Sequence, residues 1–476
     1  MRAELAIVGA GPAGMAAAQV AARYGIDVVV IDEQGQPGGQ ILRQPPAQFR
    51  VRQWLTDRVY RSTQKLLQTS TAQTGIRWIH QSSVIGIFNH NQEHELHLNG
   101  PDGVTSLVAS RVLIAAGCYD MPVSFPGSTL PGVMATGGIQ AFVKSQRIIP
   151  GERFVFAGSH PLQLIVADQV TQAGGTVEAV VFSQPLKTVL GLIPYTGALL
   201  RHPAKLIYIA GAYLRLLRNG VKITTSSTLS RAIGNNSLES VQIVPVSGKD
   251  ADKDGKEIAC DRLGLCFSFL ASTDLARQAG AQCAWSEKGG GWLAEHDEWM
   301  RSSVPGIYVA GEVTGVAGAD VAELEGLIAG YAAALDEERI DLATAQQQLA
   351  GQRRKLKHAQ NFADALSALS YPGIELLRDL MNDDSVICKC EELSVGKLKQ
   401  TLRDNPLIRD VNAIKLLSRC GMGLCQGRYC SFQLSTLLAS DYDIAAETGG
   451  TYKARFPTKP VTIESLLHNT AESKQS

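Results

Sequence analysis

The beginning of the chain alternates between short apolar runs and stretches rich in glycine or alanine. Glu4 to Val8 is an apolar run typical of a buried strand, and residues 9–14 read Gly-Ala-Gly-Pro-Ala-Gly. The alanines between Met15 and Tyr24 favour a helix that packs closely on a sheet, and Ile26 to Ile31 forms the next apolar run. The pattern therefore predicts a strand, a glycine turn, a helix and a second strand.

A second unit of the same kind is predicted farther along the chain. Arg153 to Ala157 reads as a strand, Pro161 to Ala173 as a helix and Thr176 to Phe182 as another strand. Its turn has His160 and Gln163 where a dinucleotide turn has its second and third glycines, and a β-carbon at the second position would obstruct a pyrophosphate. The next strand also ends without an acid or arginine for a nicotinamide ribose. We expect this unit to be structural or to hold another nucleotide, with His160 capping the helix rather than acting in catalysis.

The last third of the chain contains a long helical pattern, a compact segment and a polar tail. Residues 341–370 have few helix breakers and apolar side chains at helical intervals, which predicts a helical connector. Residues 371–373 read Tyr-Pro-Gly and interrupt the chain before a compact segment from Val386 to about Leu438. The residues from Tyr452 to Ser476 are more polar, and we expect this tail to wrap over another domain or subunit without taking part in chemistry.

Composition and charge narrow the classes of protein. The 476 residues suffice for about three domains, and a hydrophobic content of 45% can fill several cores. The 45 basic and 45 acidic side chains cancel, so we expect no nucleic-acid partner. The most apolar internal stretch, Leu206 to Leu217, is shorter than the ~20 residues that span a bilayer, and no transmembrane helix is expected. We expect a cytoplasmic protein, and peripheral association with the inner face of the membrane is left open.

The predicted glycine turn has the spacing of an adenine dinucleotide site. In such a turn Gly9 permits the tight bend, Gly11 lets the backbone approach a pyrophosphate, and Gly14 lets helix and strand touch. Asp32 and Glu33 follow the next strand, close to the ~20-residue separation expected for a carboxylate that binds a ribose hydroxyl. We favour Asp32 as the ribose ligand, although the hexad by itself would also suit a purely structural turn.

Five of the nine cysteines lie between Cys388 and Cys430, a density that favours metal ligation in a reducing compartment over disulfides. Four thiolates in two close pairs can hold either tetrahedral zinc or a [2Fe–2S] cluster. The one-residue gap between Cys388 and Cys390 differs from zinc-finger spacing and resembles the small ferredoxin domain associated with bacterioferritin. This resemblance implies Cys388, Cys390, Cys425 and Cys430 as ligands, with Cys420 as a packed bystander and first alternative ligand.

Further glycine-rich segments resemble the two-dinucleotide-domain flavoproteins. Residues 113–117 and 306–312 resemble two sequence marks of that family, which implies FAD near Gly117, Gly311 and Glu312, the last beside the ribityl chain. The loop that begins Gly38-Gly39-Gln40 and ends in two prolines is also suited to cradle the cofactor. The redox cysteine pair of the disulfide reductases of this fold is missing after the second strand. The other cysteines are expected to be small buried side chains without a catalytic role: Cys118, Cys260, Cys266 and Cys283.

With both motif sets placed, the chain resembles the alpha subunits of bacterial heteromeric amino-acid dehydrogenases, the class of opine oxidase, hydrogen cyanide synthase and D-hydroxyproline dehydrogenase. The residues most specific to this resemblance are residues 38–46, 125–127, 130–134 and 420–428. The resemblance implies that the partner is a D-amino-acid-oxidase-like flavoprotein beta subunit. We leave open a second flavin at a subunit interface and a small ferredoxin-like gamma subunit.

The predicted fold class is α/β, a two-dinucleotide-domain flavoprotein of the Rossmann type followed by a small helical [2Fe–2S] domain. The predicted domains are a discontinuous FAD-binding domain (1–120 plus 300–335), a second, degenerate nucleotide-binding-like domain (121–299), a helical connector (336–384), a ferredoxin-like domain (385–440) and a tail (441–476).

The predicted function is an electron-transfer subunit of a multi-subunit dehydrogenase that oxidises the C–N bond of a secondary or D-amino acid (D-hydroxyproline, opine, proline or glycine class). A flavin can accept an electron pair from an organic donor and release the electrons singly to a one-electron centre. No side chain is assigned to catalysis, because no acid–base dyad or nucleophile stands out by its spacing. The alternatives are a self-sufficient NAD(P)H:acceptor oxidoreductase with a ferredoxin-like output domain and, third, a metal-binding module.

Overall fold

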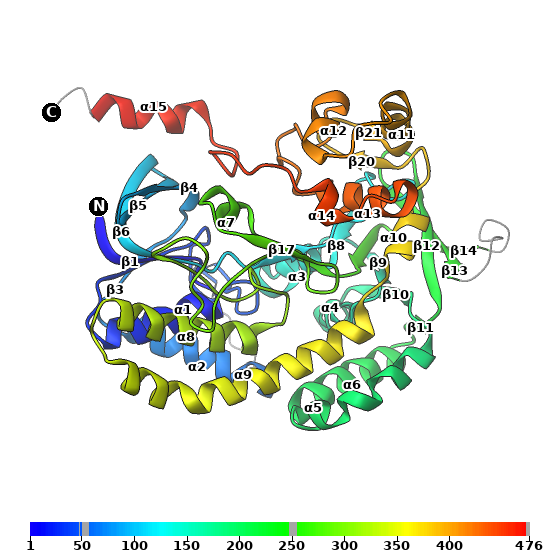
Figure 1. Cartoon of the computed structure of the whole chain (residues 1–476). Helices are drawn as coiled ribbons and strands as arrows, with labels where there is room; N and C mark the ends of the chain where they lie inside the picture. Colours follow the sequence, from blue (N-terminus) through cyan, green and yellow to red (C-terminus); the bar gives the residue numbers. More distant parts are fainter. Residues whose placement is uncertain (47, 50–56, 247–254, 473–476) are drawn as a thin grey trace. The chain divides into compact units, whose positions relative to one another are not determined.

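The computed structural model describes residues 1–46, 48–49, 57–246 and 255–472, which form two compact units (Figure 1). Unit 1 comprises Met1–Tyr119, Leu270–Asp364 and Lys453–Ser476, and unit 2 comprises Asp120–Phe269 and Ala365–Tyr452. Each unit contains a largely parallel sheet with helices, so the α/β class agrees with the sequence. The predicted domain boundaries are placed differently: residues 270–299 belong to unit 1, and the cysteine-rich segment shares unit 2 with the second nucleotide-like domain.

The sheet of unit 1 has the strand order β3-β2-β1-β6-β5-β4, with β19 also beside β6. Strands β1, β2, β3, β6 and β19 pair in parallel, and β4 and β5 are antiparallel. The carboxyl ends of the parallel strands therefore meet at one edge, where ligands bind in open α/β sheets. The bounds are β1 Arg2–Val8, β2 Val28–Ile31, β3 Ile76–Ile79, β4 Ser83–His90, β5 Glu93–Gly100, β6 Gly103–Ile114 and β19 Ile307–Val309.

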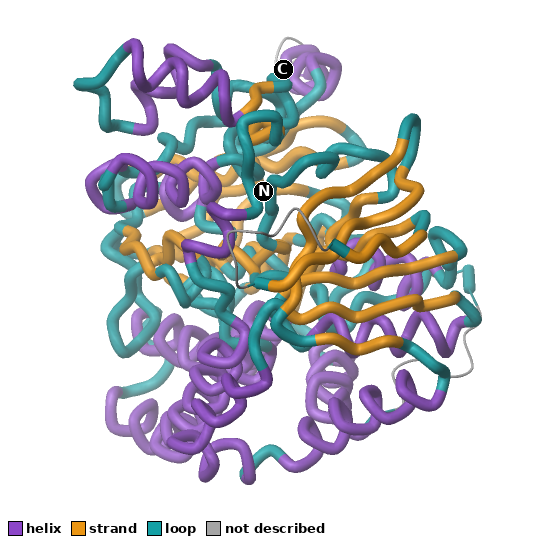
Figure 2. The backbone as a smooth tube through the Cα atoms, turned by 90° about the vertical axis from the view of Figure 1, so that its right-hand side faces the viewer, coloured by secondary structure: helices purple, strands orange, loops and turns teal. Residues whose placement is uncertain are grey.

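Helices pack beside this sheet, as the purple and orange segments of Figure 2 show. Helix α1 (Pro12–Arg23) lies against α8 (Ala319–Asp336), and the two approach closely because Gly326 and Gly330 of α8 face the backbone of Ala13 and Ala17. The first part of α9 adds apolar side chains to the same core. The other elements here are η1 Arg58–Tyr60, α2 Arg61–Ala72, β7 Cys118–Asp120, β16 Phe269–Ala271, α7 Asp274–Gln278, β17 Cys283–Ser286, β18 Gly291–Ala294 and α9 Leu342–Ser370.

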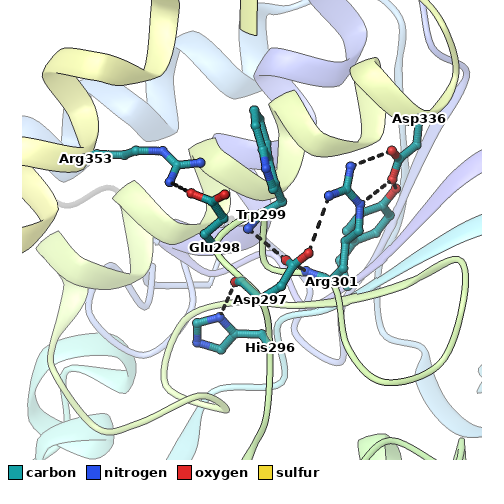
Figure 3. Close-up of polar contacts among 8 residues, drawn as sticks. His296, Asp297, Glu298, Trp299, Arg301, Asp336 and Arg353 are labelled. Atoms are coloured by element: carbon teal, nitrogen blue, oxygen red, sulfur yellow. Dashed lines mark hydrogen bonds and ion pairs between the residues drawn. The ribbon is translucent and has the colours of Figure 1, made fainter. Parts of the chain in front are cut away.

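A polar network fastens the segment before β19 to these helices (Figure 3). Arg301 donates two hydrogen bonds to Asp336 at the end of α8, at 2.6 and 2.9 Å. Arg353 of α9 is paired with Glu298 at 2.5 Å, and both guanidinium groups lie over the Trp299 ring, 5.0 Å (Arg353) and 5.6 Å (Arg301) from its centroid. Because the network joins three separate segments, it stabilises the sheet edge next to β19.

Unit 2 contains a second parallel sheet, in the order β11-β10-β9-β15-β8, and an antiparallel sheet, β12-β13-β14. Strand β10 has the predicted bounds Thr176–Phe182, and α4 (Leu162–Ala173) follows the predicted turn. The other bounds are β8 Val133–Ala135, α3 Thr136–Ala141, η2 Phe142–Gln146, β9 Arg153–Gly158, η3 Leu186–Tyr195, α5 Thr196–Leu200, α6 Pro203–Arg218, β11 Lys222–Thr224, β12 Ser227–Gly234, β13 Leu238–Pro245, β14 Lys256–Ala259 and β15 Arg262–Cys266.

The cysteine-rich segment of unit 2 is mostly helical and has its own core. Ser394 caps α11 and Asp410 caps α12 through backbone amides, and Cys430 is the N-cap residue of α13. These caps fix the helix starts around the cysteines. The bounds are α10 Ile374–Asp379, β20 Val386–Cys388, β21 Leu393–Ser394, α11 Val395–Asp404, α12 Val411–Ser418, α13 Ser431–Tyr442 and α14 Ala446–Gly449.

The C-terminal tail crosses strands β4 and β5 of unit 1 before α15 (Ile463–Glu472). The Phe456 ring makes edge contacts with Phe88 and His97, and the Thr458 amide donates to the Ile85 carbonyl at 2.8 Å. The tail thus covers part of a sheet, in line with the prediction that it wraps over another part of the molecule. Among the described residues, none of the helices has the length and apolar character needed to cross a bilayer.

Candidate cofactor and metal sites

The glycine turn after β1 is built from contacts that exclude β-carbons. Gly9 has φ +106°, and a β-carbon there would lie 2.4 Å from the Ala115 carbonyl oxygen. A β-carbon on Gly14 would lie 1.9 Å from the Gly9 oxygen, so helix and turn touch as the sequence predicts. At Gly11, in contrast, the nearest atom to an added β-carbon is the Gly39 Cα at 4.0 Å. The turn is therefore closed at its first and third glycines and accessible at the second, which suits the close approach of a pyrophosphate.

Asp32 braces this turn through both carboxylate oxygens. Oδ2 accepts the Ala10 amide at 2.6 Å and Oδ1 accepts the Gln34 amide at 2.7 Å. Burial raises the pKa of Asp32, and these two hydrogen bonds act against the rise. Each oxygen keeps a second lone pair, so the carboxylate can still accept from a ribose hydroxyl. Glu33 points elsewhere, because its Oε1 lies 2.5 Å from the ammonium group of Lys459 in the tail.

The loop after β2 meets the glycine turn through its two glycines. The Gly38 amide donates to the Ala10 carbonyl at 2.8 Å, and a β-carbon on Gly39 would lie 2.8 Å from the Gly11 Cα. The Gln40 side chain is exposed and accepts a hydrogen bond from Arg43 at 2.6 Å. Gly38 and Gly39 thus shape the cradle through backbone, whereas the structure gives the Gln40 side chain a contact outside it.

The segment after β19 reaches the same edge of the sheet. Gly311 has φ +80°, and a β-carbon on it would lie 3.0 Å from the Ala13 side chain at the start of α1. The Gly311 amide donates to Glu325 Oε2 at 2.9 Å, and the Thr314 hydroxyl donates to the same oxygen at 2.8 Å. Glu325 is 4% exposed, and burial raises its pKa. Sequence reasoning missed this carboxylate; an acid beside Gly326 in a helix rich in alanine was the available signal.

Glu312 is paired with a cysteine that had no role assigned from the sequence. The Cys118 thiol donates to Glu312 Oε2 at 2.7 Å, and burial raises the pKa of Glu312. Gly117, with φ +72°, precedes Cys118, and its carbonyl accepts the Ser272 amide at 2.9 Å. The expectation of four buried cysteines holds for Cys260 and Cys266. It is wrong for Cys118 and Cys283, which are partly exposed.

The degenerate turn of unit 2 is filled by its own side chains. His160 Nδ1 accepts the Leu162 amide at 3.2 Å, so the imidazole caps the start of α4 as predicted. Its ring lies edge-on to Phe269, with the centroids 5.1 Å apart, and burial lowers the pKa of His160 to about 4. Gln163 is fully buried and directs its amide to the Val181 carbonyl at 3.5 Å. Both side chains occupy space that glycines leave open in a dinucleotide turn.

The five cysteines of the helical segment form a group of three and a pair. The sulfurs of Cys388, Cys420 and Cys430 lie within 4.8 Å of one another and are buried. Cys425 is hydrogen-bonded to Cys390, which is exposed. Hydrogen bonds from Cys420 and then Cys430 lower the pKa of Cys388, and the contact with Cys388 raises the pKa of Cys430. Negative charge therefore collects on Cys388, as a metal-binding thiolate requires.

The grouping of the five thiols fits a two-iron cluster and brings Cys420 close to the proposed ligands. Soft thiolates suit iron–sulfur centres, and a [2Fe–2S] cluster needs two sulfurs at each iron. Cys390 with Cys425 supplies one pair, and Cys388 with Cys430 supplies the other. Cys420 is buried as expected of a packed residue, but it lies in contact with two proposed ligands. The four-ligand set stays a prediction, with Cys420 as the alternative that the geometry offers.

Tyr452 closes this group, contrary to the expectation that it begins a tail without chemistry. The side chain is 4% exposed, and its hydroxyl is hydrogen-bonded to the Cys420 and Cys430 thiols. A β-carbon on Gly421 would lie 2.6 Å from the ring, and one on Gly427 would lie 2.2 Å from it. The two glycines therefore leave room for the ring. Spacing along the chain offers no signal for Tyr452, because α13 and α14 separate it from the cysteines.

The comparison with known proteins defines the class of protein. Residues 3–348 match the pyridine nucleotide-disulphide oxidoreductase family, and the chain belongs to this family. The family implies FAD, and the glycine turn, Asp32 and the Gly311 segment of unit 1 fit that cofactor in the geometry described above. The chain is an oxidoreductase.

Two curated relatives are similar over nearly the whole chain. The first of the two subunits of this kind comes from the opine oxidase of Agrobacterium tumefaciens (strain Ach5); it is 30% identical, over 98% of this chain and 91% of the relative. Hydrogen cyanide synthase subunit HcnB of Pseudomonas aeruginosa is 30% identical over 97% of each chain. Among solved structures, L-proline dehydrogenase from P. horikoshii superimposes with a TM-score of 0.71 at 23% identity, covering 98% of this chain and 79% of the other, and shows the same fold.

Proposed function

We propose that this chain is the FAD- and [2Fe–2S]-containing electron-transfer subunit of a multi-subunit dehydrogenase. The substrate class is a secondary or D-amino acid whose C–N bond is oxidised: D-hydroxyproline, an opine, proline or glycine. The observation that carries the proposal is the 30% identity to subunits of opine oxidase and hydrogen cyanide synthase over almost the whole chain. A family model covers only residues 3–348, whereas these relatives extend across the cysteine group as well.

The chain's own residues would then hold two redox groups. The backbone at Gly9, Gly11 and Gly39 would cradle the FAD pyrophosphate, and Asp32 would accept from the ribose. Bound FAD supplies exchange between two-electron and one-electron chemistry. Four thiolates, from Cys388, Cys390, Cys425 and Cys430, would hold the cluster. A D-amino-acid-oxidase-like beta subunit would provide the substrate site, which agrees with the lack of an assigned acid–base dyad in this chain.

The NAD(P)H:acceptor alternative is not favoured. His160 and Gln163 fill the turn where the second unit would need glycines for a nicotinamide dinucleotide. Stopped-flow mixing with stoichiometric NADH should therefore leave the flavin absorbance unchanged on the time scale of turnover. Rapid bleaching would instead support the alternative.

The partner requirement is tested by dye reduction. The purified chain alone should reduce no dye with D-hydroxyproline, an opine, proline or glycine, and co-expression with the beta subunit should restore reduction with one of them. Full substrate-dependent reduction by the chain alone would refute the proposal. Metal analysis tests the cluster separately: about two iron and two labile sulfide per chain are expected, and zinc without sulfide would remove the cluster while leaving the flavin role intact.

A further inference from the structure

An apolar segment of unit 2 lacks a cover in the described structure. Of the 24 exposed large hydrophobic side chains among the described residues, nine lie within residues 186–217. Helices η3 and α5 contain no buried residue, although η3 reads Leu-Lys-Thr-Val-Leu-Gly-Leu-Ile-Pro-Tyr. Leu186, Leu190, Ile193 and Leu200 are between 66% and 72% exposed. A contiguous apolar surface of this kind marks a site of interaction rather than ordinary surface.

Helix α6 continues this surface because it is apolar on two faces. Ala212 and Leu216 are buried, and Leu216 belongs to the core beneath the parallel sheet of unit 2. Ile207, Leu214 and Leu217 follow one another at intervals of seven and three residues, so they share a different face of the helix. They are 71%, 51% and 45% exposed. One face thus anchors the helix to unit 2, and the other faces outward.

The charge around this surface is entirely of one sign. Residues 179–238 contain seven lysines and arginines and no acidic residue, although the whole chain has equal numbers of both. Arg215 is compensated by Asp168, at 2.7 Å. The other cations of the helical region flank the exposed apolar side chains: Lys187, Arg201, Lys205, Arg218 and Lys222.

We propose that residues 186–222 dock the protein on the surface of an anionic lipid bilayer. Leucine, isoleucine and valine side chains would enter the boundary between headgroups and acyl chains, and the flanking cations would contact acidic headgroups. Two features favour lipid over a protein partner. The exposed apolar residues are aliphatic apart from Tyr213, whereas protein interfaces are enriched in aromatic residues, and lysine is depleted in such interfaces. The proposal concerns location and stands independently of the redox function.

Vesicle co-sedimentation of the full chain tests the proposal. The chain should bind phosphatidylglycerol–phosphatidylcholine vesicles, bind pure phosphatidylcholine more weakly, and lose the difference at high salt because screening removes the electrostatic part. The double variant L190S/I193S should bind about tenfold more weakly, since two aliphatic groups no longer leave water. The charge variant K187E/R218E should lose the preference for phosphatidylglycerol.

A matched control separates the segment from general hydrophobicity. Leu407 and Leu416 are 93% and 74% exposed in the cysteine-rich segment of the same unit, and L407S/L416S should bind vesicles like the parent chain. Because all the changed side chains are exposed, flavin absorbance and melting temperature should remain at parental values in every variant. The proposal is overturned if neither vesicle type binds the parent chain. It is also overturned if L190S/I193S instead abolishes self-association or binding to a protein subunit while vesicle binding is unaffected.

Discussion

The contact between α1 and α8 should make Gly326 intolerant of a single methyl group. A β-carbon at Gly326 would lie 2.0 Å from the Ala13 oxygen, 2.5 Å from its Cα and 2.6 Å from its carbonyl carbon. All three atoms belong to the backbone, so no rotamer change relieves the clash, and α8 must move until the first distance exceeds 3.0 Å. Alanine gains about 1 kcal/mol over glycine in a helix, but forced overpacking costs about 1–3 kcal/mol. With the full clash at backbone, we expect G326A to lower the unfolding free energy by about 2 kcal/mol.

The shift should also reach the cofactor site, because Glu325 is the neighbour of Gly326 and holds the Gly311 amide. Urea unfolding followed by flavin fluorescence measures the stability, and the ratio of flavin to protein absorbance measures FAD retention. The matched control is G351A, since Gly351 lies in α9 with no atom within 4 Å of an added β-carbon. That variant should gain up to about 1 kcal/mol and keep its FAD. If G326A were as stable as G351A and retained all its flavin, the close α1–α8 contact would be refuted.

Three further outcomes are expected. With a folded pKa of about 4 against about 6.5 unfolded, His160 destabilises the fold as pH falls below 6.5, by about 2 kcal/mol at pH 5; H160N should therefore lose less unfolding free energy between pH 7 and pH 5 in urea titrations. C420S should keep about two iron per chain and C388S should lose them, and the reverse result would place Cys420 among the ligands. Y452F should make the cluster potential more negative by on the order of tens of mV in a spectroscopic redox titration, and an unchanged potential would remove the hydroxyl from its surroundings.

Local patterns in the sequence were sufficient for the elements that depend on neighbouring residues. Strand β10 was found with its predicted bounds, and α9 (Leu342–Ser370) differs from its predicted start by one residue. Apolar periodicity and glycine turns determine such elements within a few residues. The two compact units were not predictable in the same way. Each is assembled from segments far apart in the sequence, and only packing decides that residues 270–299 join the first sheet.

The same distinction holds at the sites. The glycines and Asp32 could be found because their spacing is local, and the cysteines could be found because five lie close together in sequence. Glu325 and Tyr452 could not be assigned from spacing, since each acts on residues brought together only by the fold. Glu325 holds an amide in the preceding turn, and Tyr452 reaches thiols more than twenty residues earlier. The sequence located the groups that carry the chemistry but not those that position them.

The second nucleotide-like domain has lost the turn of a dinucleotide site but keeps a role in positioning the cysteine group. The loop before β8 provides the contacts: the Ser124 hydroxyl donates to the Val386 carbonyl at 2.7 Å, and the Lys389 ammonium donates to the Ser128 carbonyl at 3.0 Å. Both partners lie in or beside the hairpin that carries Cys388. Gly127 between them has φ +81°, and a β-carbon there would lie 2.3 Å from the Ala232 oxygen, so this loop is itself fixed to the domain. A domain whose turn is filled by His160 can thus persist because its sheet holds the platform on which the thiols are arranged.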